Sequence, residues 1–156
     1  MIGFLSSAIA ILRLPPPRST AAIVDRLIAW HVFWAIGASN LLNFVYHVFY
    51  GRMAAAYIGW ADSPFQLEVG MASLGFAAVA FVAAFRSFDL RLAAILGPSL
   101  FTLGAAAGHM HQMLAANNFA PGNAGAIFYA DIGLPLVGFA LLALQHRFPL
   151  PRARPK

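Results

Sequence analysis

Residues 64–85 read PFQLEVGMASLGFAAVAFVAAF, an apolar stretch that contains a single charged residue, Glu68. A helix needs about 20 mostly apolar residues to cross a bilayer, so this stretch predicts one membrane span. Three further stretches meet the same criterion, and they cover residues 27–50, 92–115 and 124–144. The sequence therefore predicts an all-α fold, a polytopic membrane four-helix bundle.

The overall composition supports a membrane protein. Of the 156 residues, 61% are hydrophobic and 10% are charged, whereas soluble domains carry about 25% charged residues. The four stretches use most of the chain, so we expect one membrane domain and no soluble enzyme domain. The absence of cysteine excludes disulfides, thiolate metal ligands and a cysteine nucleophile.

The residues before the first span form a separate apolar segment. Residues 1–14 are too short to span a bilayer comfortably, and the proline run at 15–17 ends any helix there. We expect a short N-terminal interfacial or partly inserted helix, with a short fifth span as the alternative. The predicted organisation has three parts: this helix, the four-span domain and a basic tail, at residues 1–20, 21–146 and 147–156.

The basic residues indicate how the chain is oriented. With four spans, every one of the ten lysines and arginines except Arg52 falls on the side of the two termini. The positive-inside rule then places both termini in the cytoplasm and the loops 51–63 and 117–122 outside, which is the periplasm for a bacterial inner membrane. We interpret the net charge of +5 as an orientation signal, with the lipid bilayer and not nucleic acid as the partner.

Several polar residues near the span ends have the positions of helix caps or solvated charges. Ser63 and Gln66 are predicted to form a capping box for the second span, and Asn123 to cap the fourth. Asp25 lies next to Arg26, and Asp89 lies near Arg86 and Arg91. We expect these two acids to be solvated or capping charges.

Polar residues inside the spans gather in one leaflet. An ionisable group in a membrane helix costs about 2.5–3.5 kcal/mol on insertion scales, so each is a candidate functional residue. Because successive spans alternate in direction, the candidates all fall in the outer half of the membrane: His47, Gln66, Glu68, His109, His111 and Asp131. Asn40, Asn43 and His47 recur at helical spacing and form one stripe that should face the bundle. His109 and His111 lie on different helix faces, so only one can point into a central site.

Four interpretations of these residues remain open. Divalent metals such as zinc, iron or manganese take ligands of the types found at His47, Glu68, His109 and Asp131. Two histidines on different helices at one depth suit a b-type haem, and Glu68 with a histidine suits acid–base or proton-relay chemistry. Alternatively, the polar groups bond one another and hold the helices together, at about 0.6–2 kcal/mol for each pair.

Longer motifs carry a resemblance to a known family. Their residues are Ile58-Gly59-Trp60, Ser63-Pro64-Phe65-Gln66 with Glu68 and Gly70, Gly108-His109, Asn118-Phe119-Ala120-Pro121-Gly122-Asn123-Ala124-Gly125, and Asp131 with Pro135. Over about residues 20–145 the chain resembles a family of small prokaryotic integral membrane proteins described as a domain of unknown function. The resemblance supplies no activity or cofactor, but it favours His109 over His111. It implies a set of ligand-binding residues: His47, Gln66, Glu68, His109, Asn118, Asn123 and Asp131.

Three functions remain open from the sequence. The leading hypothesis is an inner-membrane protein with an outward-facing polar pocket that binds a small ligand or a metal, with or without catalysis. One alternative is an accessory or structural subunit of a larger membrane complex, and another is a proton-coupled small transporter that works as an oligomer. The sequence names no ligand, no catalytic residue and no partner protein.

Overall fold

The computed structural model describes residues 2–151, and this part of the chain is helical with short connections. Four helical segments are long and apolar enough to cross a membrane, which confirms the predicted all-α fold with four spans. They indicate a multi-pass membrane protein. The helices in chain order are α1 (Ile2–Leu12), α2 (Thr20–His31), the π-helix η1 (Val32–Ala38), α3 (Ser39–Phe49), α4 (Gly51–Ile58), α5 (Phe65–Ala83), α6 (Phe88–Ala116), α7 (Pro121–Ala124) and α8 (Ala126–Arg147).

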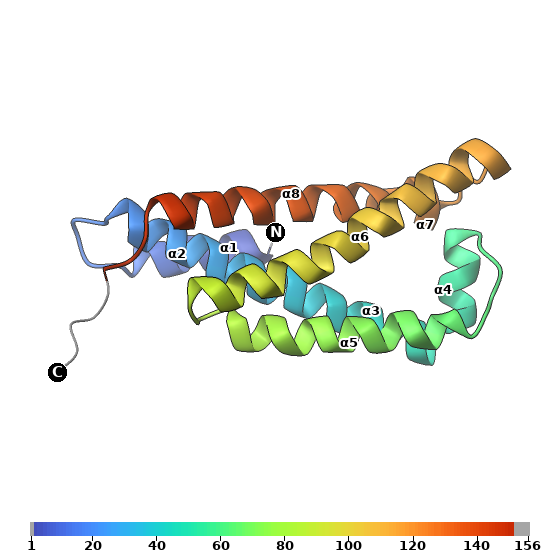
Figure 1. Cartoon of the computed structure of the whole chain (residues 1–156), viewed down its shortest axis with the longest axis horizontal. Helices are drawn as coiled ribbons and strands as arrows, with labels where there is room; N and C mark the ends of the chain where they lie inside the picture. The colour runs from blue at the N-terminus through green and yellow to red at the C-terminus, as the bar shows by residue number, and fades with distance from the viewer. Residues whose placement is uncertain (1, 152–156) are drawn as a thin grey trace.

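The four spans are arranged as two pairs that separate toward one end (Figure 1). The first span is a continuous helix made of α2, η1 and α3, and its second half packs along α5, whereas α6 packs along α8. The turn between α5 and α6 and the end of α8 mark one end of the bundle, which we call the basic end. The other end carries α4 and α7, which connect the two pairs, and we call it the far end.

Most of the compact core lies toward the basic end. Its small side chains let the helices approach closely, and its members are Ile28, Val32, Ile36, Ala80, Ala83, Ala84, Ala94, Ile95 and Leu142. Glycines serve the same close packing: a Cβ on Gly37 would lie 2.7 Å from the Phe81 ring, and one on Gly138 would lie 2.9 Å from Ile95. Close packing at native density leaves little space in this half of the bundle.

A buried ion pair also lies at the basic end. The Arg91 side chain is 2% exposed, and its Nη1 donates to Asp25 Oδ1 at 2.8 Å. Its Nε donates to the carbonyl of Ala84 at 3.1 Å. The prediction that Asp25 is a solvated or capping charge is therefore wrong, because the folded chain encloses it together with the buried guanidinium of Arg91.

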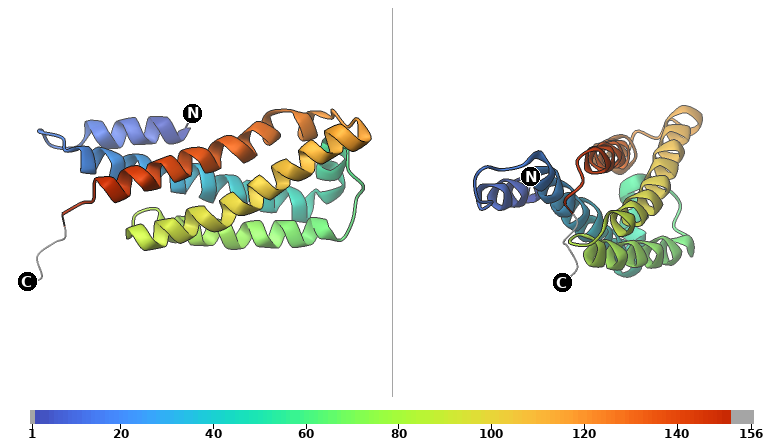
Figure 2. Two further views of the ribbon diagram at one scale, coloured as in Figure 1. Left: turned by 45° about the horizontal axis from the view of Figure 1, so that its top comes forward. Right: turned by 60° about the vertical axis from the view of Figure 1, so that its left-hand side comes forward.

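The N-terminal helix α1 lies alongside the first span and not across the end of the bundle (Figure 2). It runs back along α2 and η1, where Trp34 Nε1 donates to Ser6 Oγ at 3.1 Å. A Cβ on Gly3 would lie 3.5 Å from the Trp34 side chain, so the two helices are in close contact. With 11 residues, α1 extends over only part of the length of the first span. Residues 152–156 of the predicted basic tail lie outside the described residues.

Two of the predicted helix caps are absent. Helix α5 begins at Phe65 with Pro64 at its N-cap, and no side chain caps it. Gln66 contacts His47 of α3 instead of closing a box with Ser63. Asn123 lies inside the short helix α7, and Gly125 precedes the first residue of α8. Both predictions are wrong because these side chains bond to other helices in preference to their own helix end.

Candidate functional site

A cavity of about 520 Å³ lies between the two helix pairs, on the side of the far end. Its walls come from α3, α5, α6 and α8 and from the loop between α4 and α5. Pockets of about 300–1,000 Å³ are typical of small-molecule sites. The polar residues that line it are Ser39, Asn40, Asn43, His47, Ser63, Gln66, Ser99, Thr102, His109 and Asp131.

The stripe predicted on the first span faces the bundle, as expected. Asn40 is buried and its Nδ2 donates to the carbonyl of Ile36, at the π-helix. Asn43 Nδ2 donates to Ser73 Oγ on α5 at 2.8 Å. The third member, His47, reaches α5 as well, so α3 presents one polar face to the cavity.

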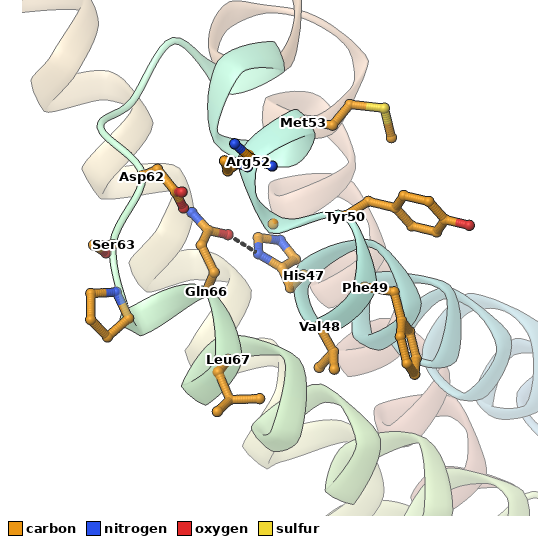
Figure 3. Close-up of a pocket in the computed structure, with 12 residues that line it drawn as sticks. His47, Val48, Phe49, Tyr50, Arg52, Met53, Asp62, Ser63, Gln66 and Leu67 are labelled. Carbon is orange, nitrogen blue, oxygen red and sulfur yellow. Dashed lines mark hydrogen bonds between the residues drawn. The ribbon is translucent and has the colours of Figure 1, made fainter.

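The contact between His47 and Gln66 lies between this cavity and a second hollow. His47 Nδ1 is 2.6 Å from Gln66 Oε1, a bond that joins α3 to α5 (Figure 3). An open cleft of about 460 Å³ lies on the far-end side of the pair, and Arg52 and Asp62 are among the residues that line it. His47, Ser63 and Gln66 line both hollows, so these three side chains separate the cleft from the interior cavity.

Asn123 is the centre of the largest hydrogen-bond network at the far end. Its side chain is fully buried, and its Oδ1 accepts from Trp60 Nε1 at 3.0 Å and from His109 Nδ1 at 2.8 Å. Its Nδ2 donates to the carbonyls of His109 and Asn118, at 3.1 and 2.8 Å. A side-chain amide offers two donors and an oxygen acceptor with two lone pairs, so Asn123 is fully satisfied and its orientation is fixed.

The loop that carries Asn123 is itself held against the end of α4. Asn118 Nδ2 donates to the carbonyls of Ile58 and Gly59, and its Oδ1 accepts from the backbone N–H of Ala120. Gly59 has a φ of +75°, a conformation that glycine adopts without steric cost. A Cβ on Gly122 would lie 2.6 Å from the Tyr57 ring, so only glycine fits there. The two far-end loops therefore form one support for the His109 ring.

These bonds determine which nitrogen of His109 carries hydrogen. Because the Oδ1 atom of Asn123 can only accept, His109 Nδ1 must be the donor. In a neutral imidazole the other nitrogen, Nε2, then has a free lone pair. Nε2 lies 3.7 Å from Asp131 Oδ2, and the His109 side chain is 5% exposed. His109 is thus held in one tautomer with its acceptor nitrogen toward an acid.

Asp131 is incompletely bonded. Its nearest polar neighbour, His109 Nε2, is beyond hydrogen-bond range at 3.7 Å. No other residue between 2 and 151 donates a hydrogen bond to its carboxylate. Pro135, four residues later, has no N–H to offer the Asp131 carbonyl. Asp131 therefore combines an unsatisfied carboxylate with an interrupted helix next to the cavity.

The structure brings together six of the seven predicted site residues. His47, Gln66, His109 and Asp131 line the cavity, and Asn118 and Asn123 lie behind His109. Glu68 is exposed on the outside of α5. Two residues along a helix turn the side chain by about 200°, so with Gln66 pointing inward Glu68 points outward.

The predicted metal set is not assembled. Between residues 2 and 151, no three His, Asp or Glu side chains lie close enough to hold one ion. Glu68 faces away, and His47 and His109 lie on opposite helix pairs. A b-type haem stays a prediction. His111 is exposed, so His109 is the histidine of α6 that belongs to the site.

Sequence reasoning missed some of the residues at the site. Trp60 has the position of an interfacial belt residue, yet its indole N–H bonds to Asn123 and its ring packs 5.2 Å from the His109 ring. Ser39, Ser99 and Thr102 line the cavity as well. The place of Trp60 in the Ile58-Gly59-Trp60 motif was a signal for it, whereas nothing in the sequence distinguishes these hydroxyl residues from other small residues of the spans.

The four long apolar helices indicate a multi-pass helical membrane protein. The chain belongs to DUF6790, a family of unknown function, whose family model matches residues 1–150. This match confirms the family resemblance predicted from the motifs. Neither the curated proteins nor the solved structures contain a match to the chain.

Proposed function

We propose that this membrane protein binds a small amphipathic molecule in the cavity between its two helix pairs. The observation that carries the proposal is Asp131, a carboxylate that lines the cavity without a hydrogen-bond donor from the described residues. An intramembrane acid is costly unless it is bonded, so an unsatisfied one indicates a site that a ligand completes.

The composition of the cavity supports a small organic ligand. Its polar groups are set among apolar and aromatic side chains such as Phe65, Phe101 and Leu134. Ligand sites commonly combine an apolar lining with a few well-placed polar groups. The core of the basic end offers no comparable space, because alanine and isoleucine side chains fill it.

We propose further that the far end faces outward, at the periplasmic side of a bacterial inner membrane. Arg13, Arg18, Arg26, Arg86 and Arg147 precede or follow the spans at the basic end, which the positive-inside rule places in the cytoplasm. A ligand then enters from the outside through the cleft beside Arg52 and Asp62. The His47–Gln66 pair separates that cleft from the cavity, so it has to yield for entry.

A role within a larger assembly is the second candidate, and one observation favours it. A Cβ on Gly104 of α6 would meet no atom of the described chain within 4 Å. Glycine on an exposed helix face lets a partner helix approach closely in membranes. Native mass spectrometry of the wild type and of Gly104→Leu tests this role: a complex that the variant loses supports it, and a monomer in both contradicts it.

Ligand binding can be tested with three probes of similar size and different charge: benzylamine, benzyl alcohol and benzoate. We expect at least one of them to raise the Tm of the purified protein in detergent. Ala105 lines the cavity, so Ala105→Trp should abolish the shift, whereas Ala107→Trp on the exposed face of α6 should retain it. No Tm shift in the wild type with any probe, or an undiminished shift in Ala105→Trp, would contradict the proposal.

Thiol labelling gives a second test that does not depend on a large substitution. Since the chain has no cysteine, Thr102→Cys would introduce a unique thiol in the cavity wall. We expect a water-soluble methanethiosulfonate reagent to modify it, and the stabilising probe to slow that reaction. Leu100→Cys, which is exposed on the outside of α6, is the matched control and should show no protection by the probe.

A further inference from the structure

We infer that the cavity selects a small organic cation with N–H groups, such as a primary ammonium ion, and that the charge of this cation pairs with Asp131. The inference rests on the proposed function, because it identifies the class of ligand that the same cavity takes. Three features of the cavity carry it: its charge, its unused hydrogen-bonding atoms and its aromatic lining.

The charge of the cavity favours a cation. Asp131 is the one carboxylate among the residues that line it, and no lysine or arginine lines it. The other titratable groups that face it are His47 from α3 and His109 from α6. Glu68 of α5 is exposed on the outside, and α7 and the lining part of η1 contribute no titratable group. An anion in this cavity would meet a carboxylate with no cation to balance it.

Several polar atoms that line the cavity are acceptors without a described donor. Asn40 and Asn43 use their Nδ2 groups to bond Ile36 and Ser73, which leaves their amide oxygens for a ligand. The Asp131 carboxylate lacks a donor, and the fixed tautomer of a neutral His109 presents a lone pair at Nε2. Buried acceptors require donors, and a primary ammonium group carries three N–H donors.

The aromatic lining suits the organic part of such a cation. Trp60, Phe65 and Phe101 line the cavity, and Trp60 packs against His109 beside the acid. An aromatic face attracts a cation within about 6 Å of its centroid, most strongly for tryptophan. A cation next to Asp131 therefore meets the carboxylate on one side and aromatic carbon on the other.

His109 and Asp131 offer the cation two acceptors at one place. Nε2 of His109 and Oδ2 of Asp131 lie 3.7 Å apart, and the bond from Nδ1 to Asn123 fixes the direction in which Nε2 points. We expect a bound ammonium ion to donate one N–H group to the carboxylate and another to Nε2.

Isothermal titration calorimetry with benzylamine, benzyl alcohol and benzoate in phosphate buffer at pH 7 tests the inference. We expect benzylamine, which is a primary ammonium ion at this pH, to bind the wild type. We expect benzyl alcohol to bind more weakly by at least about tenfold, because it lacks the charge that pairs with Asp131. Benzoate should not bind.

Matched acid variants locate the effect. Asp131→Asn should weaken benzylamine binding by more than about tenfold. Glu68→Gln, which changes the exposed acid of α5, should leave benzylamine binding unchanged. The order of affinities of the three probes for the wild type does not depend on the folding of any variant.

The outcomes separate the inference from the proposed function. If benzoate or benzyl alcohol binds as tightly as benzylamine, the inference is overturned while the cavity remains a ligand site. If none of the three probes binds, both fail. Unchanged binding in Asp131→Asn also overturns the inference, because the cation then lies elsewhere.

Discussion

Asp25 and Asp131 are acids on membrane-spanning helices at opposite ends of one bundle, and their surroundings differ in kind. Asp25 lies 2.8 Å from a buried arginine that also bonds a backbone carbonyl. Asp131 lies 3.7 Å from an imidazole nitrogen and has no other described polar partner. Their side chains are similarly enclosed, at 12% and 17% exposure, so burial alone does not distinguish them.

The difference separates a charge whose hydrogen bonds the protein completes from a charge that is left free to bind a ligand. At the basic end, alanine-rich helices close around the Arg91–Asp25 pair and complete its bonds. At the far end the helix pairs separate, and Asp131 lines the cavity of about 520 Å³ that lies between them. A buried ion pair matters for stability mainly because removing one partner leaves the other charge buried and unpaired. An incompletely bonded acid can instead form its missing bonds with a ligand.

The largest effect is expected at the basic end. Arg91→Met should lower the free energy of unfolding by about 3–5 kcal/mol, because it removes the hydrogen-bonded partner of the buried Asp25 carboxylate and leaves only Arg26, whose Nε lies 3.9 Å from Oδ2. Titration of the detergent-solubilised protein with dodecyl sulfate measures this value. Arg86→Met, at an exposed arginine of the same end, is the control and should change little. A loss below about 1 kcal/mol in Arg91→Met would show that the pair is not structural.

The second-largest effect on the free energy of unfolding is expected at Asn123, which supports the His109 ring at the far end. Asn123→Ala should lower the free energy of unfolding by about 2–4 kcal/mol, since two buried and two part-buried hydrogen bonds lose a partner. It should also weaken benzylamine binding, because His109 loses the bond that sets its tautomer. Asn117→Gly at the exposed left-handed end of α6 is the matched control, expected within about 0.5 kcal/mol of the wild type. Equal stability of Asn123→Ala and the control would contradict the network.

The smallest effect is expected on the outside of α5. Glu68→Gln should change the free energy of unfolding by less than about 0.5 kcal/mol, because Glu68 is exposed and forms no described ion pair. Dodecyl sulfate titration of this variant beside the wild type checks it. A metal dependence of stability that Glu68→Gln abolishes would show instead that Glu68 belongs to a metal site.

Composition and hydrophobic length were sufficient to predict the four spans. Each predicted span overlaps an observed one, since about 20 apolar residues have few alternatives to crossing a bilayer. Alternating helix direction predicts a common depth for His47, His109 and Asp131, and all three line the cavity.

Side-chain partners were less predictable, because they depend on the packing of helices far apart in the sequence. Gln66 has the spacing of a capping residue, but the close approach of α3 at Gly70 offers it His47 instead. Arg91 follows a loop, which is a common position for a solvated charge. Only the folded bundle brings it next to Asp25, 66 residues earlier in the chain, and encloses the two together. The π-helix η1, which places Asn40 at the cavity, has no sequence signal of the kind that caps and periodicity provide.

The central claim is that one end of the bundle is built for stability and the other for binding. Measuring the free energies of unfolding of Asp25→Asn and Asp131→Asn side by side tests it most directly. We predict a loss of about 3–5 kcal/mol for Asp25→Asn and a change within about 1 kcal/mol for Asp131→Asn, whose carboxylate has no hydrogen bond to lose. Equal losses in the two variants would contradict the account, because Asp131 would then be a structural acid like Asp25.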